Sequence, residues 1–91
     1  MRREIVIQWD KDSIEHISKH SVTDKEVNKA VNGKILMRKI SKKGVSLVEI
    51  LGEVDGRTLF IVLKPHGDRY KVVTARDAND SEKRLYKRRR K

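Results

Sequence analysis

The sequence contains no cysteine, one proline and few aromatic residues, and it has no long apolar run. Without cysteine the chain can form neither a disulfide framework nor a thiolate metal site. No apolar stretch approaches the roughly 20 residues of a membrane span, and no apolar signal-peptide segment follows Met1. We therefore expect a cytoplasmic protein that does not interact with a membrane.

Positive charge is what the chain has in excess. Lys and Arg number 23 against 13 Asp and Glu, which gives a net charge of +10 over 91 residues. The length and the 40% content of charged residues predict one domain, residues 1–91, with a small core and a basic C-terminal tail over residues 87–91. Such a charge favours RNA, DNA or an acidic protein as partner, although basic proteins without a nucleic-acid role are common.

The N-terminal segment is expected to form a strand and then a short helix. The β-branched residues 5–7 predict the strand, and Asp10 or Asp12 can cap a helix that continues to about Lys19. His16 and His20 are four residues apart, as in some metal sites. The zincin pattern also needs a glutamate directly after the first histidine, and we therefore expect no metal here.

A second helix has the clearest local signal in the chain. Thr23 and Glu26 match a capping box, and Val22 and Val27 match the hydrophobic staple that accompanies it. We expect this helix to end at residues 32–33, Asn-Gly, because both residue types tolerate positive φ.

From residue 34 onward the hydrophobic period becomes that of β-strands. We expect strands over residues 35–40, 45–51, 59–63 and 70–76, with turns at 41–44, 55–56 and 65–68. Asn79 and Glu82 then signal a last helix. The predicted fold class is α+β, with an antiparallel meander, two N-terminal helices and one C-terminal helix.

The last strand should end with a guanidinium beside that last helix. Strict alternation puts Val72 and Arg76 on one face of the strand and Ala75 on the other. An anion placed there would be attracted both by Arg76 and by the positive end of the helix dipole. The pattern therefore predicts a phosphate site at this position.

Taken together, a series of short motifs resembles the BrnT family, whose members are ribonuclease toxins of bacterial type II toxin–antitoxin systems with a RelE-like fold. The motifs are Trp9-Asp10, Ile14 to Ile17 with Lys19-His20, Val22-Thr23 with Glu26-Val27, Gly56-Arg57 with residues 59–62, and Thr74-Ala75-Arg76 with Glu82 and Tyr86. The resemblance implies a metal-independent endoribonuclease that needs no cofactor. It also implies a cognate DNA-binding antitoxin that neutralises the toxin in a hetero-oligomer.

Such cleavage needs a base, an acid and cations that stabilise the phosphorane. His20 can exchange a proton near neutral pH, and Arg57 and Arg76 match the family motifs at strand ends. Each has a structural alternative: a surface ion pair for the arginines, with Asp55 or Asp77, and a helix C-cap for His20.

The candidate RNA-binding residues are Trp9, as a stacking platform, and the cations Lys83, Arg84, Lys87 and Arg88. In the alternative interpretation Trp9 anchors the core and the charge run is a solvated surface. The function that competes with a ribonuclease is a noncatalytic module that binds nucleic acid or protein on the same scaffold.

Overall fold

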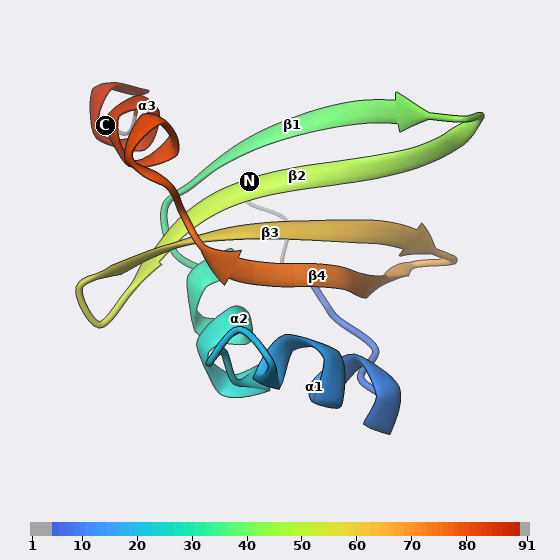
Figure 1. The fold of residues 1–91 in the computed structure, drawn as a ribbon. Coiled ribbons are helices and arrows are strands. Elements are labelled where there is room, and N and C mark those ends of the chain that lie inside the picture. The colour runs from blue at the N-terminus through green and yellow to red at the C-terminus, as the bar shows by residue number, and fades with distance from the viewer. Residues whose placement is uncertain (1–4, 90–91) are drawn as a thin grey trace.

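The computed structural model describes residues 5–89, which form three helices and a four-stranded sheet (Figure 1). The elements are α1 (Lys11–Ser18), α2 (Asp24–Val31), β1 (Ile35–Lys42), β2 (Val45–Val54), β3 (Arg57–His66), β4 (Arg69–Asp77) and α3 (Asp80–Arg89). The strands are antiparallel in the order β1-β2-β3-β4. Helices α1 and α2 cover one face of the sheet, which we call the inner face, and α3 crosses the other, the outer face. The predicted α+β meander is confirmed.

The strands are longer than the sequence predicted and two of the three hairpin turns are tighter, residues 43–44 and 67–68, whereas the Asp55-Gly56 turn is confirmed as predicted. Two-residue turns at Lys43-Gly44 and Asp55-Gly56 have positive φ at both positions, between 50° and 80°. This conformation matches the right-handed twist of the flanking strands, so pairing continues up to the turn. Among residues 5–89, no helix is both long and apolar enough to cross a membrane.

The prediction of a first strand over residues 5–7 is wrong. Within residues 5–7 only Ile7 makes a bridge, an isolated parallel one with Tyr70 of β4. Pairing stops there because the chain turns into α1, whose N-cap is Asp10. The Asp10 carboxylate accepts a hydrogen bond from the Ser13 backbone N–H at 2.7 Å.

Helix α2 begins with the predicted capping box. Thr23 Oγ1 accepts from the Glu26 N–H at 3.2 Å, and Glu26 Oε1 accepts from the Thr23 N–H at 2.9 Å. The helix ends where expected, but Asn32 has φ −100° and Gly33 is also outside the positive-φ region. Instead of turning left-handed, Asn32 donates its side-chain amide to the Asn28 carbonyl at 2.9 Å.

The hydrophobic core is divided between the two faces of the sheet. The larger cluster lies on the inner face, and its fully enclosed members include Ile17, Val27, Leu59, Ile61 and Leu63. The smaller cluster joins α3 to the outer face and consists of Leu51, Ala78 and Tyr86, with Leu36 and Phe60 packed against it. Each fully buried aliphatic side chain contributes about 1.5–3 kcal/mol, so α1 and α2 are held far more strongly than α3.

A bulge in β4 determines which face Arg76 occupies. The register between β3 and β4 shifts by one residue and skips Val73. Val72 and Ala75, three residues apart, therefore both enter the inner core. Arg76 lies on the outer face above Phe60. The prediction that Val72 and Arg76 share a face is wrong, because one extra residue reverses a period-two pattern.

Gly52 of β2 lies where α2 approaches the sheet most closely. A Cβ at this position would come 3.0 Å from the Ala30 carbonyl oxygen, so Gly52→Ala should destabilise the fold by about 1–3 kcal/mol through overpacking. Gly33→Ala is the matched control, since its Cβ would lie 3.6 Å from the Lys29 carbonyl oxygen, an ordinary van der Waals contact. Urea unfolding measures both, and equal stabilities would contradict the close approach.

Candidate functional site

The two predicted catalytic arginines lie at the same end of the sheet but on opposite faces. Arg57 begins β3 and reaches Glu26 of α2 on the inner side, whereas Arg76, near the end of β4, reaches Glu82 of α3 on the outer side. Both belong to the neighbouring strands β3 and β4. The structure thus brings each arginine to a different helix and does not direct both into one pocket.

Arg57 is held by two carboxylates. Its Nη1 donates to Glu26 Oε2 at 2.8 Å and its Nε to Asp77 Oδ1 at 3.0 Å, with Nη2 also 3.0 Å from Asp77 Oδ1. Glu26 is the same residue that closes the capping box of α2 with Thr23. One side chain therefore caps α2 and also joins it to the sheet.

Arg76 repeats this arrangement on the outer face. Its two terminal nitrogens pair with the two carboxylate oxygens of Glu82 at 2.9 and 3.0 Å, and Nη1 also donates to the Asp77 carbonyl at 3.0 Å. The guanidinium carbon lies 4.3 Å from the centre of the Phe60 ring, a cation–π contact. Glu82 and Asn79 form the capping box of α3, with both hydrogen bonds 2.8 Å long.

These contacts favour the charged form of both glutamates. The Thr23 backbone N–H lowers the pKa of Glu26 below its ordinary 4.5; burial opposes this, and the Arg57 charge and hydrogen bond reinforce it. Burial raises the pKa of Glu82, but the hydrogen bonds from Arg76 and from the Asn79 N–H outweigh it, so that the pKa is lowered overall.

The expected phosphate position beside Arg76 is already filled by an anion of the protein itself. The Glu82 carboxylate occupies the point where the guanidinium and the first turn of α3 converge. A phosphate would have to displace Glu82 before it could contact the guanidinium edge that faces α3. The sequence showed Asn79 and Glu82 as a helix start, but it did not show that Arg76 would bind the same carboxylate.

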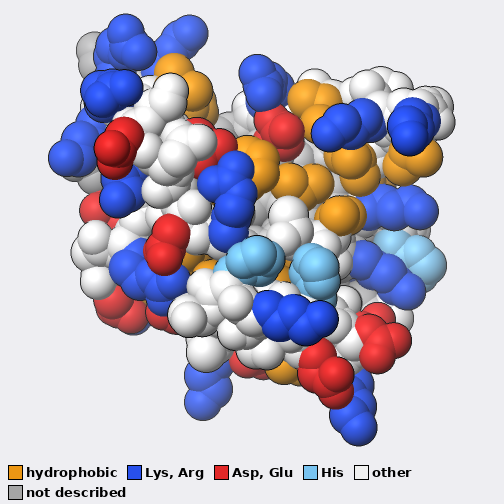
Figure 2. Space-filling model, viewed as in Figure 1, with side chains coloured by type: hydrophobic (Ala, Val, Ile, Leu, Met, Phe, Trp, Pro, Cys, Tyr) orange, Lys and Arg blue, Asp and Glu red, His pale blue; other side chains and the backbone are white. Residues whose placement is uncertain are grey.

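The structure places His16 and His20 side by side. Their ring centres are 6.0 Å apart with the rings edge to face, and both side chains are exposed. The alternative role of His20 as a helix C-cap is wrong by one residue, because α1 ends at Ser18 with Lys19 as C-cap. Figure 2 shows two neighbouring histidine side chains, with basic side chains close by, on the face viewed in Figure 1.

Trp9 is half-buried and packs against the inner core. Its indole Nε1 donates to Asn28 Oδ1 of α2 at 3.2 Å. Both contacts correspond to the core-anchor interpretation, since the ring ties the segment before α1 to α2. A base that stacks on Trp9 could use only the part of the ring that the core leaves accessible.

The four predicted phosphate-binding cations project from α3. Lys83, Arg84, Lys87 and Arg88 are exposed, and in the described part of the chain none of them pairs with a carboxylate. Figure 2 shows lysine and arginine side chains gathered over α3. The tail predicted from residue 87 onward is helical through Arg89, because Tyr86 is buried and its hydroxyl donates to the Lys34 carbonyl at 2.8 Å. Residues 90–91 of that tail lie outside the described residues.

Within residues 5–89, no group of three or more histidine, aspartate or glutamate side chains is arranged to hold a metal ion. Comparisons of the chain with protein-family models, with curated proteins and with solved structures returned no match. The relation to BrnT proteins therefore stays a prediction that depends on the residues quoted for it.

The lowered pKa values of Glu26 and Glu82 predict a loss of stability in acid. The unfolded state takes up protons at a higher pH than the folded state does, so the stabilisation is complete above about pH 4.5 and is lost as the pH falls through the lower, folded pKa values. Thermal melts from about pH 7 to about pH 3 should show this fall, and it should be smaller in Glu26→Gln and Glu82→Gln. Glutamine can still accept the N-cap hydrogen bond but cannot form the ion pair. Parallel profiles for wild type and variants would contradict the assignment.

Proposed function

We propose that this protein is a BrnT-like toxin, a metal-independent endoribonuclease of the bacterial cytoplasm that binds RNA through α3 and is neutralised by an antitoxin. The observation that supports RNA binding is the set of exposed cations on α3 that pair with no carboxylate of residues 5–89. Their i, i+4 spacing, 83 with 87 and 84 with 88, places them in two adjacent rows on the helix surface. A polyanion lying along α3 would contact both rows.

The chemistry would fall to His20, with Arg57 or Arg76 as the cation. His20 is exposed, so its imidazole, a group that commonly acts as general acid or base, is accessible to solvent and substrate. At Arg57 the carboxylate that a phosphate could replace most easily is Asp77, which is 60% exposed. Glu26 is 22% exposed and also caps α2, so its displacement would cost more.

The second candidate function is a noncatalytic module that binds RNA or protein. The pairing of both arginines with capping-box carboxylates favours it, because a guanidinium that already carries a partner must lose that partner to contact a phosphorane. RNA binding by α3 is common to both candidates, so binding and cleavage need separate tests.

Binding to single-stranded RNA should weaken with salt at a log–log slope of about −0.7 for each phosphate contact. Replacing the α3 cations with glutamine should lower the affinity and flatten the slope, as measured by fluorescence anisotropy at several salt concentrations. The residues replaced are Lys83, Arg84, Lys87 and Arg88.

The control is a second variant in which four exposed lysines outside α3 are replaced with glutamine, so that both variants have the same net charge. Those residues are Lys11, Lys25, Lys39 and Lys43. If the two variants lose affinity and slope equally, the binding depends on net charge and not on α3. An affinity independent of salt would contradict the electrostatic account altogether.

Cleavage should depend on the planar guanidinium of Arg76. Arg76→Lys keeps the charge but loses the two-point contact, so single-turnover cleavage of a labelled RNA should fall by more than RNA affinity does. Loss of the donor altogether in Arg76→Ala should cost on the order of 10²–10³ in rate.

Glu82→Gln is the matched control for Arg76, because it breaks the same ion pair and leaves the guanidinium in place. If Arg76 acts in catalysis, this variant should melt at a lower temperature but still cleave RNA. If the role of Arg76 is structural, all three variants should lose activity only in proportion to their loss of stability. Absence of cleavage by the wild-type protein, free of antitoxin and tested with and without ribosomes, would favour the noncatalytic module.

A further inference from the structure

Helix α3 covers only part of the outer face of the sheet. It crosses the strands near one end and contacts the row formed by Leu36, Leu51 and Phe60, which are cross-strand neighbours on β1, β2 and β3. A strand of eight residues such as β1 is about 26 Å long, whereas a helix is about 10–12 Å wide. The uncovered remainder has room for one further helix beside α3.

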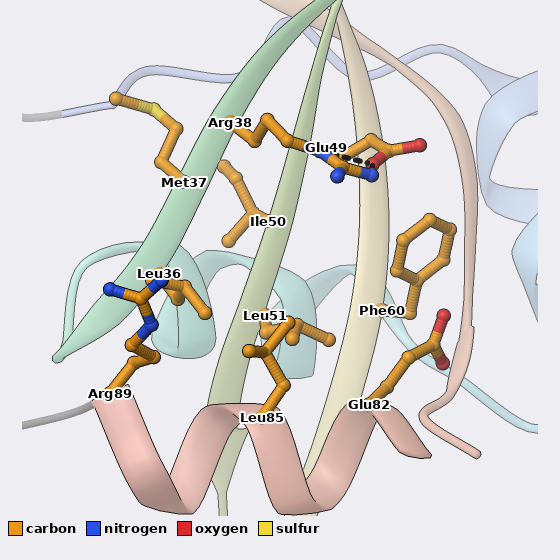
Figure 3. A pocket seen from close by; sticks show the side chains of 10 residues that line it. All are labelled: Leu36, Met37, Arg38, Glu49, Ile50, Leu51, Phe60, Glu82, Leu85 and Arg89. Atoms are coloured by element: carbon orange, nitrogen blue, oxygen red, sulfur yellow. Dashed lines mark hydrogen bonds and ion pairs between the residues drawn. The ribbon is translucent and has the colours of Figure 1, made fainter.

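The border between α3 and the uncovered part is a groove of about 460 Å³ (Figure 3). Leu85 of α3 forms one wall, and Leu51 and Phe60 lie on the floor. Beyond the groove the apolar surface continues along the outer face with Ile40 and Leu47, which are paired across β1 and β2. A helix beside α3, at the usual interaxial distance of about 8–10 Å, would cover both areas.

The charges around this surface are positive. Its two carboxylates, Glu49 and Glu82, are each paired with an arginine, namely Arg38 and Arg76. Arg89 also lines the groove and, among the described residues, has no carboxylate partner. Three lysines stand on the same face by register, Lys42, Lys64 and Lys71.

From this geometry we infer that the outer face docks an amphipathic helix of a partner protein, with an apolar stripe against the groove and acidic residues along its flanks. A second copy of this chain is disfavoured as occupant, because each copy carries a net charge of +10. Acidic flanks would meet Arg89 and the three lysines of the rim, and apolar residues would bury Leu85. Only one consequence rests on the proposed function: an acidic helix next to α3 would compete with RNA for the α3 cations.

The test uses synthetic peptides of about 14 residues, roughly 21 Å long and therefore able to cross four strands about 4.8 Å apart. One peptide carries a leucine stripe with glutamate flanks, a second the same stripe with lysine flanks, and a third is a scrambled version of the first. Methyl NMR titrations should show that the first peptide shifts Leu36, Leu51 and Leu85, whereas the other two do not. Leu85→Glu should weaken its binding about tenfold or more.

The matched control is Ile14→Glu on α1, since Ile14 and Leu85 are almost equally exposed at 38% and 36%. Thermal melts must show that both variants are folded, and Ile14→Glu should bind the first peptide as the wild-type protein does.

The inference would be overturned by equal binding of the lysine peptide, by shifts confined to α1 and α2, or by no shifts at all. It would equally be overturned if single-stranded RNA shifted the sheet methyl groups of Leu36 and Leu51 as the first peptide does, or if light scattering showed a dimer that Leu85→Glu dissociates. RNA cleavage is measured separately, so a protein that binds the peptide but does not cleave RNA would refute the proposed ribonuclease and leave the docking site intact.

Discussion

The attachment of helices to the sheet depends on one repeated interaction, an arginine at a strand end paired with the glutamate of a capping box. Glu26 and Glu82 each accept a hydrogen bond from the backbone at the start of a helix and a second from a guanidinium of the sheet. The same glutamate that begins each helix thereby also joins that helix to the sheet, one on each face. Because the core beneath α3 is small, this interaction matters more on the outer face than on the inner one.

The same interaction limits what the arginines can do chemically. A cation whose partner is a half-buried carboxylate is positioned well but already neutralised, and a substrate must compete for it. The α3 cations are the opposite case, since they are exposed and, within residues 5–89, pair with no carboxylate. The molecule thus has two kinds of positive charge: the two paired arginines that are the predicted catalytic cations, and the accessible cations on the surface of α3. An RNA would contact the α3 cations first.

The features that could be predicted from the sequence are those whose signal is local. The capping boxes at Thr23 and Asn79 and the Asp55-Gly56 turn each depend on residues a few positions apart, and all three are present in the structure. Contacts between residues far apart in the sequence could not be predicted: the pairing of Arg57 with Glu26 joins residues 31 positions apart. The groove on the outer face could not be predicted either. The position at which α3 crosses the sheet decides which strand residues stay uncovered, and the sequence does not show that position.

The bulge at Val73 shows that the placement of α3 depends on how β4 pairs with β3. With Val73 left out of the ladder, Arg76 lies on the outer face, and the helix that follows is tied to that arginine. Regular pairing of every residue of β4 would instead turn Arg76 towards the inner face and bring α3 against the face that α1 and α2 already occupy. Deletion of the extra residue would remove the bulge and leave Ala75 in the inner core and Arg76 on the outer face. Among proteins that share this architecture, the strand-end arginine should therefore directly follow the last core residue of β4, as Arg76 follows Ala75, whether or not a bulge precedes it.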